Sequence, residues 1–147
     1  MASTRQLTAQ IEAQLDDEIG TLQKDAAESI VLAYPSPYSV GMSSLGYQTI
    51  YRTVNESSGR AAHRAFLPDD VEAWRRARSP VLSYEARRPI GDYPLIALSV
   101  AYEGEIAGLI QLLELSGIAP LAEHRSDKDP FIVAGGPLTF SNPLPLA

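Results

Sequence analysis

Short apolar runs alternate with amphipathic segments along the chain. The apolar runs predict four strands, at Ser29–Tyr34, Ala61–Leu67, Leu95–Val100 and Phe131–Ala134. The amphipathic segments predict four helices, over residues 5–19, from Ser43 or Ser44 to about Asn55, from Asp69 to Arg78 and over residues 105–117. Because strands and helices alternate, we expect a doubly wound α/β fold with a mostly parallel sheet and right-handed crossovers.

Two finer features of the pattern are also predicted. The buried side of the second helix is expected to hold Leu45, Ile50 and Val54. Weaker apolar runs predict two additional short strands, at Val81–Arg87 and Ile118–Glu123.

The chain is expected to divide at about residue 28. Residues 1–28 would form an N-terminal helix and a lead-in segment, and residues 29–147 would form a single α/β domain. The last predicted strand is followed by a proline-rich loop, SNPLPLA, and by no helix. Since a doubly wound domain normally continues after such a strand, we expect the sequence to be a fragment of a longer protein.

The composition is that of a globular domain, because 45% of the 147 residues are hydrophobic and 20% are charged. No apolar run approaches the ~20 residues that span a bilayer, and the N-terminus lacks the apolar core of a signal peptide. We therefore expect a cytoplasmic protein with no membrane partner. The net charge of −6 argues against nucleic acid as a partner, because phosphate binding needs concentrated positive charge.

Charge is unevenly distributed along the sequence. Residues 12–28 hold six acids and one lysine, whereas residues 60–88 hold seven arginines and four acids. Two interpretations are open. The charges form solvated helix faces with their ion pairs, or they form a surface that docks another domain or an anionic ligand.

The chain has no cysteine and two histidines, His63 and His124. The absence of cysteine excludes disulfides, thiolate catalysis, zinc–cysteine sites and cysteine-ligated iron–sulfur clusters within this chain. His63 lies in a predicted strand and His124 in a polar loop. We therefore expect surface or structural roles for both histidines and no histidine-rich metal site.

Three loops are expected to meet at the carboxyl edge of the sheet: residues 34–44, 99–104 and 135–142. Their glycines let the backbone approach a ligand closely, and the amides at the helix starts can hold an anion. No G-x-G-x-x-G motif follows the first strand, and G-M-S-S-L-G is one residue too long for a nucleophile elbow. Glu103 is a candidate general base, or a charge that stabilises a helix N-terminus. The loops predict a binding edge more strongly than a catalytic site.

Four blocks of sequence, taken in order, resemble one protein family: YPSPYSVGMSSLGYQTIYR, RAFLPDD, LIALSVAYEGEIAGLIQLLELSGI and FIVAGGPLTFSNPLPLA. They are similar to the N-terminal region of a largely uncharacterised family of radical S-adenosylmethionine (SAM) proteins. In that family a cobalamin-binding-like Rossmann domain precedes the radical SAM barrel. The likeness covers residues 16–147. It implies a flavodoxin-like sheet whose carboxyl edge faces a cobalamin or the barrel of the same polypeptide.

The resemblance also implies which residues line the site, and it implies no catalytic or metal-ligating residue. With Ser43 added for its place at a helix start, the cofactor-binding candidates are Pro35, Ser39, Val40, Gly41, Met42 and Ser43 in the first loop, Ser99 and Tyr102 in the second, and Gly135, Gly136, Pro137 and Thr139 in the third.

The sequence departs from the family pattern in two motifs. The D-x-H-x-x-G motif of histidine-ligated cobalamin domains is absent, so any cobalamin would lack a histidine from the first loop. The C-x-x-x-C-x-x-C motif of the [4Fe–4S] cluster is also absent, so SAM, the cluster and catalysis are expected only in the downstream barrel.

Three functions are therefore hypotheses. The domain holds a cofactor such as cobalamin, or covers the active site of the barrel. Alternatively, it is a degenerate Rossmann interaction module that binds no cofactor. The third hypothesis is a flavodoxin-like binder of a phosphorylated metabolite.

Overall fold

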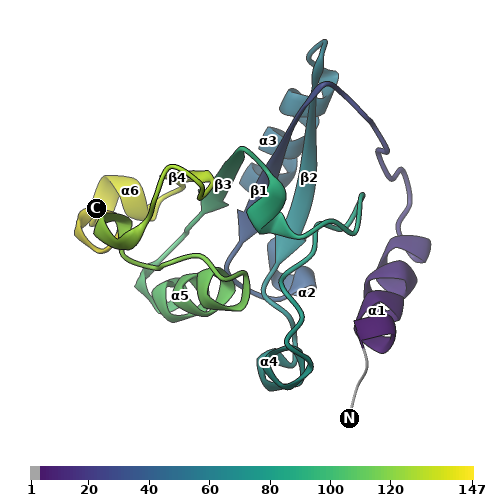
Figure 1. Ribbon diagram of the computed structural model, residues 1–147. Helices are drawn as coiled ribbons and strands as arrows, with labels where there is room; N and C mark the ends of the chain where they lie inside the picture. The colour runs from purple at the N-terminus through teal and green to yellow at the C-terminus, as the bar shows by residue number, and fades with distance from the viewer. Residues whose placement is uncertain (1–3) are drawn as a thin grey trace.

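The computed structural model describes residues 4–147 and contains a four-stranded sheet with helices on both sides (Figure 1). The strands are β1 (Glu28–Tyr34), β2 (Arg60–Phe66), β3 (Leu95–Ser99) and β4 (Phe131–Gly135). Their order is β2-β1-β3-β4, and all three pairings are parallel. The predicted doubly wound α/β fold of the flavodoxin or Rossmann pattern is therefore confirmed.

Six helices are present in the described chain: α1 (Thr4–Asp16), α2 (Tyr38–Gly41), α3 (Leu45–Glu56), α4 (Val71–Ala77), α5 (Ile106–Leu115) and α6 (Leu138–Ser141). Short 3₁₀ turns cover Ile90–Asp92, Glu103–Glu105, Ala122–His124 and Leu144–Leu146. Ser44 and Asp70 cap α3 and α4, since each side chain accepts a hydrogen bond from a backbone N–H three residues later. Within residues 4–147, no helix is both long and apolar enough to cross a membrane.

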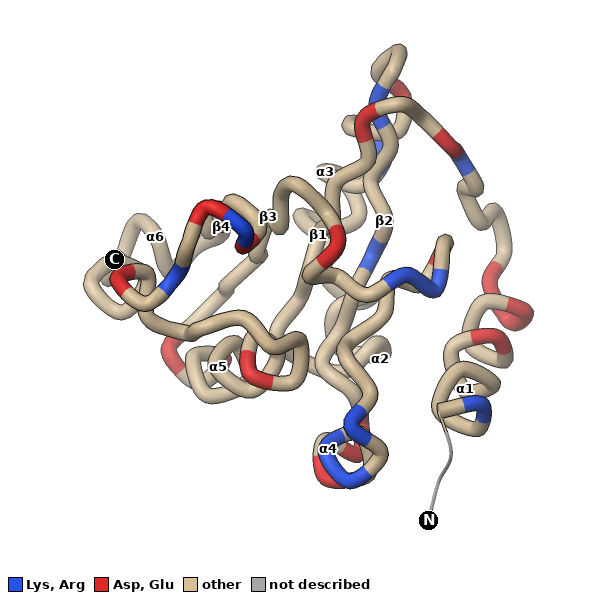
Figure 2. Tube along the Cα trace, viewed as in Figure 1, with Lys and Arg blue, Asp and Glu red and all other residues tan. Residues whose placement is uncertain are grey.

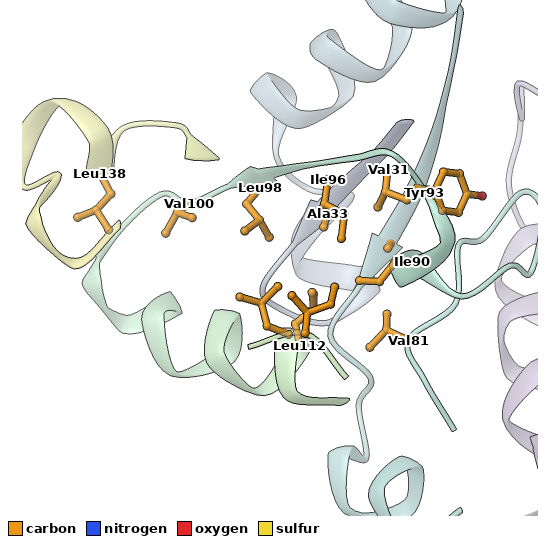
Figure 3. Packing of buried hydrophobic residues seen from close by; sticks show 13 residues of the cluster. Val31, Ala33, Val81, Ile90, Tyr93, Ile96, Leu98, Val100, Leu112 and Leu138 are labelled. Atoms are coloured by element: carbon orange, nitrogen blue, oxygen red, sulfur yellow. The ribbon is translucent and has the colours of Figure 1, made fainter. Parts of the chain in front are cut away.

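Helices α3 and α5 cover opposite faces of the sheet, because side chains alternate between the two faces along each strand. One apolar cluster joins the sheet to α5 through Val31, Ile96 and Leu112 (Figure 3). The next residue of β1, Leu32, points the other way and packs with Tyr47 of α3. The chain therefore changes sides between β1 and β3, which is the topological switch point of the sheet.

The buried side of α3 differs from the prediction. Leu45 and Ile50 are exposed, whereas Tyr47 and Tyr51 are buried. The hydroxyl of Tyr47 donates a hydrogen bond to the carbonyl oxygen of Leu32 at 2.7 Å. A tyrosine ring can fill the space above a sheet when its hydroxyl finds a buried partner, so these positions displace the aliphatic residues from the interface.

Neither of the two additional short strands forms in full, although an isolated antiparallel bridge joins Leu82 to Pro89 at the first of them. Residues 81–87 instead make a tight turn, in which Arg87 has φ +51° and its N–H donates to Ser83 O at 2.9 Å. Residues 118–123 are irregular and lead into a 3₁₀ turn. Pro120 has no N–H with which to join a sheet, which explains why this apolar run stays outside it.

Gly108 is required where α5 crosses the loop after β1. A Cβ atom at this position would lie 2.2 Å from the carbonyl oxygen of Pro35. We expect Gly108→Ala to lower the free energy of unfolding by about 1–3 kcal/mol, because α5 would have to move away from the sheet. Urea denaturation followed by circular dichroism measures this change.

Gly46 of α3 provides the matched control, since no atom lies within 4 Å of a Cβ added there. Gly46→Ala should raise the free energy of unfolding by up to about 1 kcal/mol through the better helix propensity of alanine. Equal losses of stability in the two variants would contradict the close approach of α5 to Pro35.

Candidate functional site

The carboxyl ends of β1, β3 and β4 bring the three predicted loops together, because these strands are neighbours and run in the same direction. The second and third loops are joined by two backbone hydrogen bonds, from Val100 N–H to Gly135 O at 2.8 Å and from Leu138 N–H to Val100 O at 3.3 Å. The first and second loops meet where Ser36 Oγ donates to Glu105 Oε1 at 3.4 Å. The predicted meeting of the loops is confirmed.

A buried carboxylate, Glu105, joins the first and second loops at the switch point. Its side chain sits at the start of α5, where the helix dipole favours negative charge, and only 2% of the residue is exposed. Ala101 N–H donates to Oε2 at 2.6 Å, and Ser36 Oγ of the first loop donates to Oε1. Burial, followed by the charge of Glu105, raises the pKa of Tyr34, so the phenol stays protonated. Glu105 therefore ties the first two loops together.

The sequence pattern singled out the neighbouring acid, Glu103, and missed Glu105. Glu103 is exposed, so its carboxylate lies in solvent rather than in the switch point. The available signal for Glu105 was its place as the last acid before a strongly apolar helix. A carboxylate at that place can accept bonds from the amides of the preceding loop.

The glycines of the loops serve packing more than ligand approach. A Cβ at Gly136, which has φ +109°, would lie 2.4 Å from Val100 O. A Cβ at Gly41 would lie 2.4 Å from the ring of Phe66. Of these three glycines, only Gly135 has open space beside it, since no atom lies within 4 Å of a Cβ added there.

The remaining predicted site residues are placed in three ways. Ser43 Oγ and Thr139 Oγ donate to carbonyl oxygens of their own loops, at 2.7 Å in both cases. Met42 turns away from the edge, and its sulfur accepts a hydrogen bond from Arg64 at 3.4 Å. Pro35 is buried and Ser99 is half-buried at the end of β3, whereas the remaining candidates are exposed: Ser39, Val40, Tyr102 and Pro137.

Two aromatic side chains are exposed at the carboxyl edge. Tyr102, in the second loop, is 59% exposed, and its ring lies against Gly104, where a Cβ would be 2.3 Å from the ring. Phe140, in α6, is 92% exposed. Sequence reasoning included Tyr102 and missed Phe140, which stands in the motif PLTFSNP beside the predicted Thr139. The edge therefore presents apolar rings to solvent.

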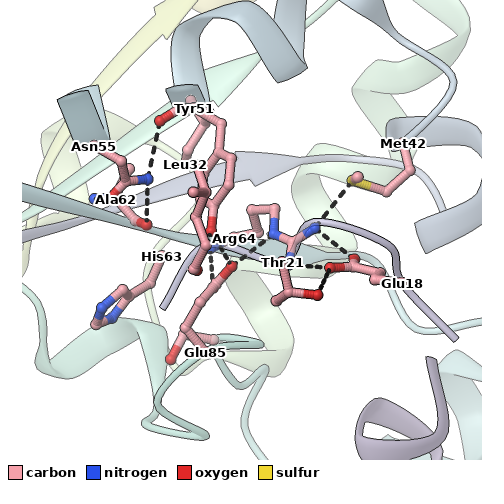
Figure 4. A network of polar contacts seen from close by, with 12 residues as sticks. Glu18, Thr21, Leu32, Met42, Tyr51, Asn55, Ala62, His63, Arg64 and Glu85 are labelled. Atoms are coloured by element: carbon pink, nitrogen blue, oxygen red, sulfur yellow. Dashed lines mark hydrogen bonds and ion pairs between the residues drawn. The ribbon is translucent and has the colours of Figure 1, made fainter. Parts of the chain in front are cut away.

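A second polar cluster lies on the α3 side of the sheet and is centred on Arg64 of β2 (Figure 4). The Arg64 guanidinium donates to Glu18 Oε1 and to Glu85 Oε1, both at 2.6 Å, and its backbone N–H donates to Glu85 Oε2. Tyr38 and Tyr51 hydroxyls complete the cluster by donating to Glu18 and Glu85. Every charged group in it has a partner of opposite charge, so the cluster joins segments of the chain and leaves no free group for chemistry.

The uneven charge of the sequence is partly explained by such pairs. The acidic segment 12–28 lies beside the arginine-rich segment 60–88 (Figure 2), and the two are joined by Glu18–Arg64 and by Glu12–Arg87 at 3.8 Å. A pocket of about 220 Å³ next to the Arg64 cluster is lined by Thr21, among other residues. Of its charged lining residues, Glu18 and Arg64 pair with each other, whereas Arg52 is exposed and has no ion pair among the described residues.

The histidines take the structural and surface roles that were expected. The His63 ring is buried and bonds the Tyr93 hydroxyl at 2.7 Å and Lys24 O at 3.3 Å. His124 is exposed beside Glu123. No group of three or more potential metal ligands occurs in the part of the chain that the structure describes.

Stability is expected to depend on pH through Glu18. Burial raises the pKa of this carboxyl, but the hydrogen bonds from Arg64 and Tyr38 outweigh it and hold the pKa below its ordinary value of 4.5. The stabilisation is therefore present above about pH 4.5 and is lost as the pH falls through the lowered pKa. Glu18→Gln should cost about 2 kcal/mol of unfolding free energy at pH 7 and less at pH 3.

Urea denaturation at a series of pH values measures this difference. Glu28→Gln is the control, because Glu28 pairs with Arg60 in solvent, with 72% of its side chain exposed, and should change stability little at any pH. A loss in Glu18→Gln that is the same at pH 3 and pH 7 would contradict the assigned role of the carboxylate.

Most of the chain matches a known protein family. The profile of the family described as "Radical SAM proteins, N-terminal" matches residues 46–147, which is more than half of the chain. The match spans α3, all of the sheet except β1, and the second and third loops of the carboxyl edge. No curated protein and no solved structure matches the chain significantly. The chain therefore belongs to the family of N-terminal regions of radical SAM proteins.

Proposed function

We propose that this domain packs its carboxyl edge against the radical SAM domain of the same polypeptide and covers the active site there. The family assignment implies such a downstream domain in the same chain. The observation that carries the proposal is the exposure of Tyr102 and Phe140, which are 59% and 92% exposed at the ends of β3 and β4. Exposed aromatic rings in two adjoining loops are typical of a surface that another protein surface covers.

The polar groups of the carboxyl edge favour a covering role rather than anion binding. The hydroxyls of Ser43 and Thr139 are used inside their own loops, and Ala101 N–H is used by Glu105. Glu103 and Glu105 add negative charge beside the second loop, which disfavours a phosphate there. A flavodoxin-like binder of a phosphorylated metabolite is therefore the least supported of the three hypotheses.

Cobalamin binding is a second proposal, and the open space beside Gly135 and the exposed ring of Tyr102 favour it. The residues present do not fit a histidine-ligated cobalamin. His63 is engaged with Tyr93 and Lys24, and His124 lies in the turn before β4, at the other end of that strand from the loops. Any cobalamin bound here would be held by contacts to its ring and side chains, without an axial histidine from this chain.

Absorbance titration of hydroxocobalamin with the full-length protein tests this restriction. We expect no spectral change from histidine ligation, and the same titration curve for His124→Ala as for the wild type, because the exposed His124 side chain lies away from the three loops. A saturable shift that disappears in His124→Ala would contradict the proposed absence of an axial histidine.

Chelation of cluster iron tests the covering role in the full-length protein under anaerobic conditions. We expect Tyr102→Asp and Phe140→Asp to speed the loss of iron to a water-soluble chelator by about tenfold, because a displaced cover admits solvent to the active site. Both side chains are exposed within this domain, so neither change should affect its own folding.

Ile19→Asp provides the matched control, since Ile19 is fully exposed and lies in the lead-in segment, outside the second and third loops that carry Tyr102 and Phe140. Its rate of iron loss should equal that of the wild type. If the two edge variants also lose iron at the wild-type rate, the domain does not cover the cluster.

A further inference from the structure

The outer side of β4 is an open sheet edge. β4 is the last strand in the order β2-β1-β3-β4, so it has a neighbour on one side only. Phe131 N–H and Gly135 O point toward β3, where they bond Pro94 O and Val100 N–H. Because the direction of the backbone groups alternates along a parallel strand, the N–H and C=O groups of Ile132 and Ala134 point outward.

Both faces beside this edge are largely apolar, and the charged side chain that lines the groove, Arg125, donates its hydrogen bonds to Ala119 O and Pro120 O. On the α3 side, Phe131 and Val133 are exposed. On the α5 side, Ile132 and Ala134 line a groove of about 250 Å³, whose opposite wall is formed by Leu109, Ile110 and Leu113 of α5. Edge strands are normally protected by charge, by a bulge or by a cover, and β4, FIVAG, has no charged residue. The edge and the groove therefore have the character of a surface that is covered.

Connection handedness indicates what would fill the groove. The chain passes from β3 through α5 to β4, one strand outward, with α5 on one face of the sheet. A right-handed crossover from β4 to a strand beyond it would place its helix on the same face, next to α5. That position is the groove, and Leu146, which follows β4 in the chain, already packs there.

We propose that a helix followed by a strand, from the segment after residue 147 of the same radical SAM polypeptide, completes the sheet at this surface. The strand pairs in parallel with β4, and the helix fills the groove beside α5. The inference rests on the proposed packing of the domain within its own polypeptide. It concerns a different surface, because β4's outer edge and the groove lie beside the sheet and not at the ends of its strands.

Other binding partners would cover only part of this surface. A second copy of the chain related by a two-fold axis would pair β4 with its counterpart in the antiparallel direction and would bring no helix to the groove. A bound extended peptide would likewise pair with the edge and leave the groove open. Only a helix–strand unit covers both the backbone groups of Ile132 and Ala134 and the apolar wall of α5.

Hydrogen exchange at β4 in the full-length protein tests the proposal. The amides of Ile132 and Ala134 should exchange about 100-fold or more slowly there than in the 147-residue chain, because they gain partners in the added strand. The amides of Val133 and Gly135 donate to β3 and should be slow in both proteins, which also reports that the shorter chain is folded. Fragmentation mass spectrometry of peptides that cover residues 129–137 separates the alternate amides.

Fast exchange of Ile132 and Ala134 in the full-length protein would overturn the proposal. Protection that appears only at concentrations where the protein dimerises in sedimentation would overturn it in favour of a second copy. Neither result depends on the rate of iron chelation, so this inference and the covering role can fail separately.

A pair of isoleucine substitutions tests the groove in the full-length protein alone. Ile110 of α5 is 39% exposed and Ile50 of α3 is 48% exposed, so lysine at either position would be tolerated if both sites stayed in solvent. We expect Ile110→Lys to lower the melting temperature by about 5 °C or more and Ile50→Lys to change it by less than about 2 °C. Equal shifts would mean that no helix fills the groove.

Discussion

Parallel pairing of β1 with both β2 and β3 is the constraint on which the rest of the structure depends. Because parallel neighbours cannot be joined by a tight turn, each connection must cross a face of the sheet. The carboxyl ends of the strands therefore lie together at one edge. The connection from β1 to β2 crosses the face of the sheet that α3 covers. The chain then passes to β3, on the other side of β1, and α5 covers the opposite face. The three loops of the carboxyl edge, and the switch point between the first two, follow from this order.

Two buried carboxylate clusters hold this arrangement, and each works in a different way. At the switch point Glu105 accepts hydrogen bonds from uncharged groups and the N-terminal end of α5 favours its charge. On the α3 side, Glu18 and Glu85 share the Arg64 guanidinium, which brings the lead-in segment and the turn at residues 81–87 onto β2. Neither cluster has the free groups of a catalytic centre, which agrees with a domain whose role is to pack and position.

Two of the surfaces left open by the fold have different physical character. The carboxyl edge presents aromatic rings next to glycine-containing loops, whereas the outer side of β4 presents unpaired backbone groups between two apolar faces. Rings alone can be covered by any complementary apolar surface. Water satisfies unpaired backbone groups while the edge is open, and another strand is the protein partner that satisfies them in a regular way. The two surfaces are therefore expected to meet different parts of the same polypeptide.

Local patterns in the sequence were enough to predict the four strands, the four longer helices, the α/β class and the loops of the carboxyl edge. Apolar runs, helix periodicity and capping residues act over a few neighbouring residues, and so they can be read along the chain. Tertiary structure decided which partners the polar groups find. Glu105 is buried and Glu103 is not, Met42 faces Arg64, and Tyr47 replaces Leu45 at the core, because each depends on residues distant in the sequence. The same reason explains why the open edge of β4 is visible only once the strand order is known.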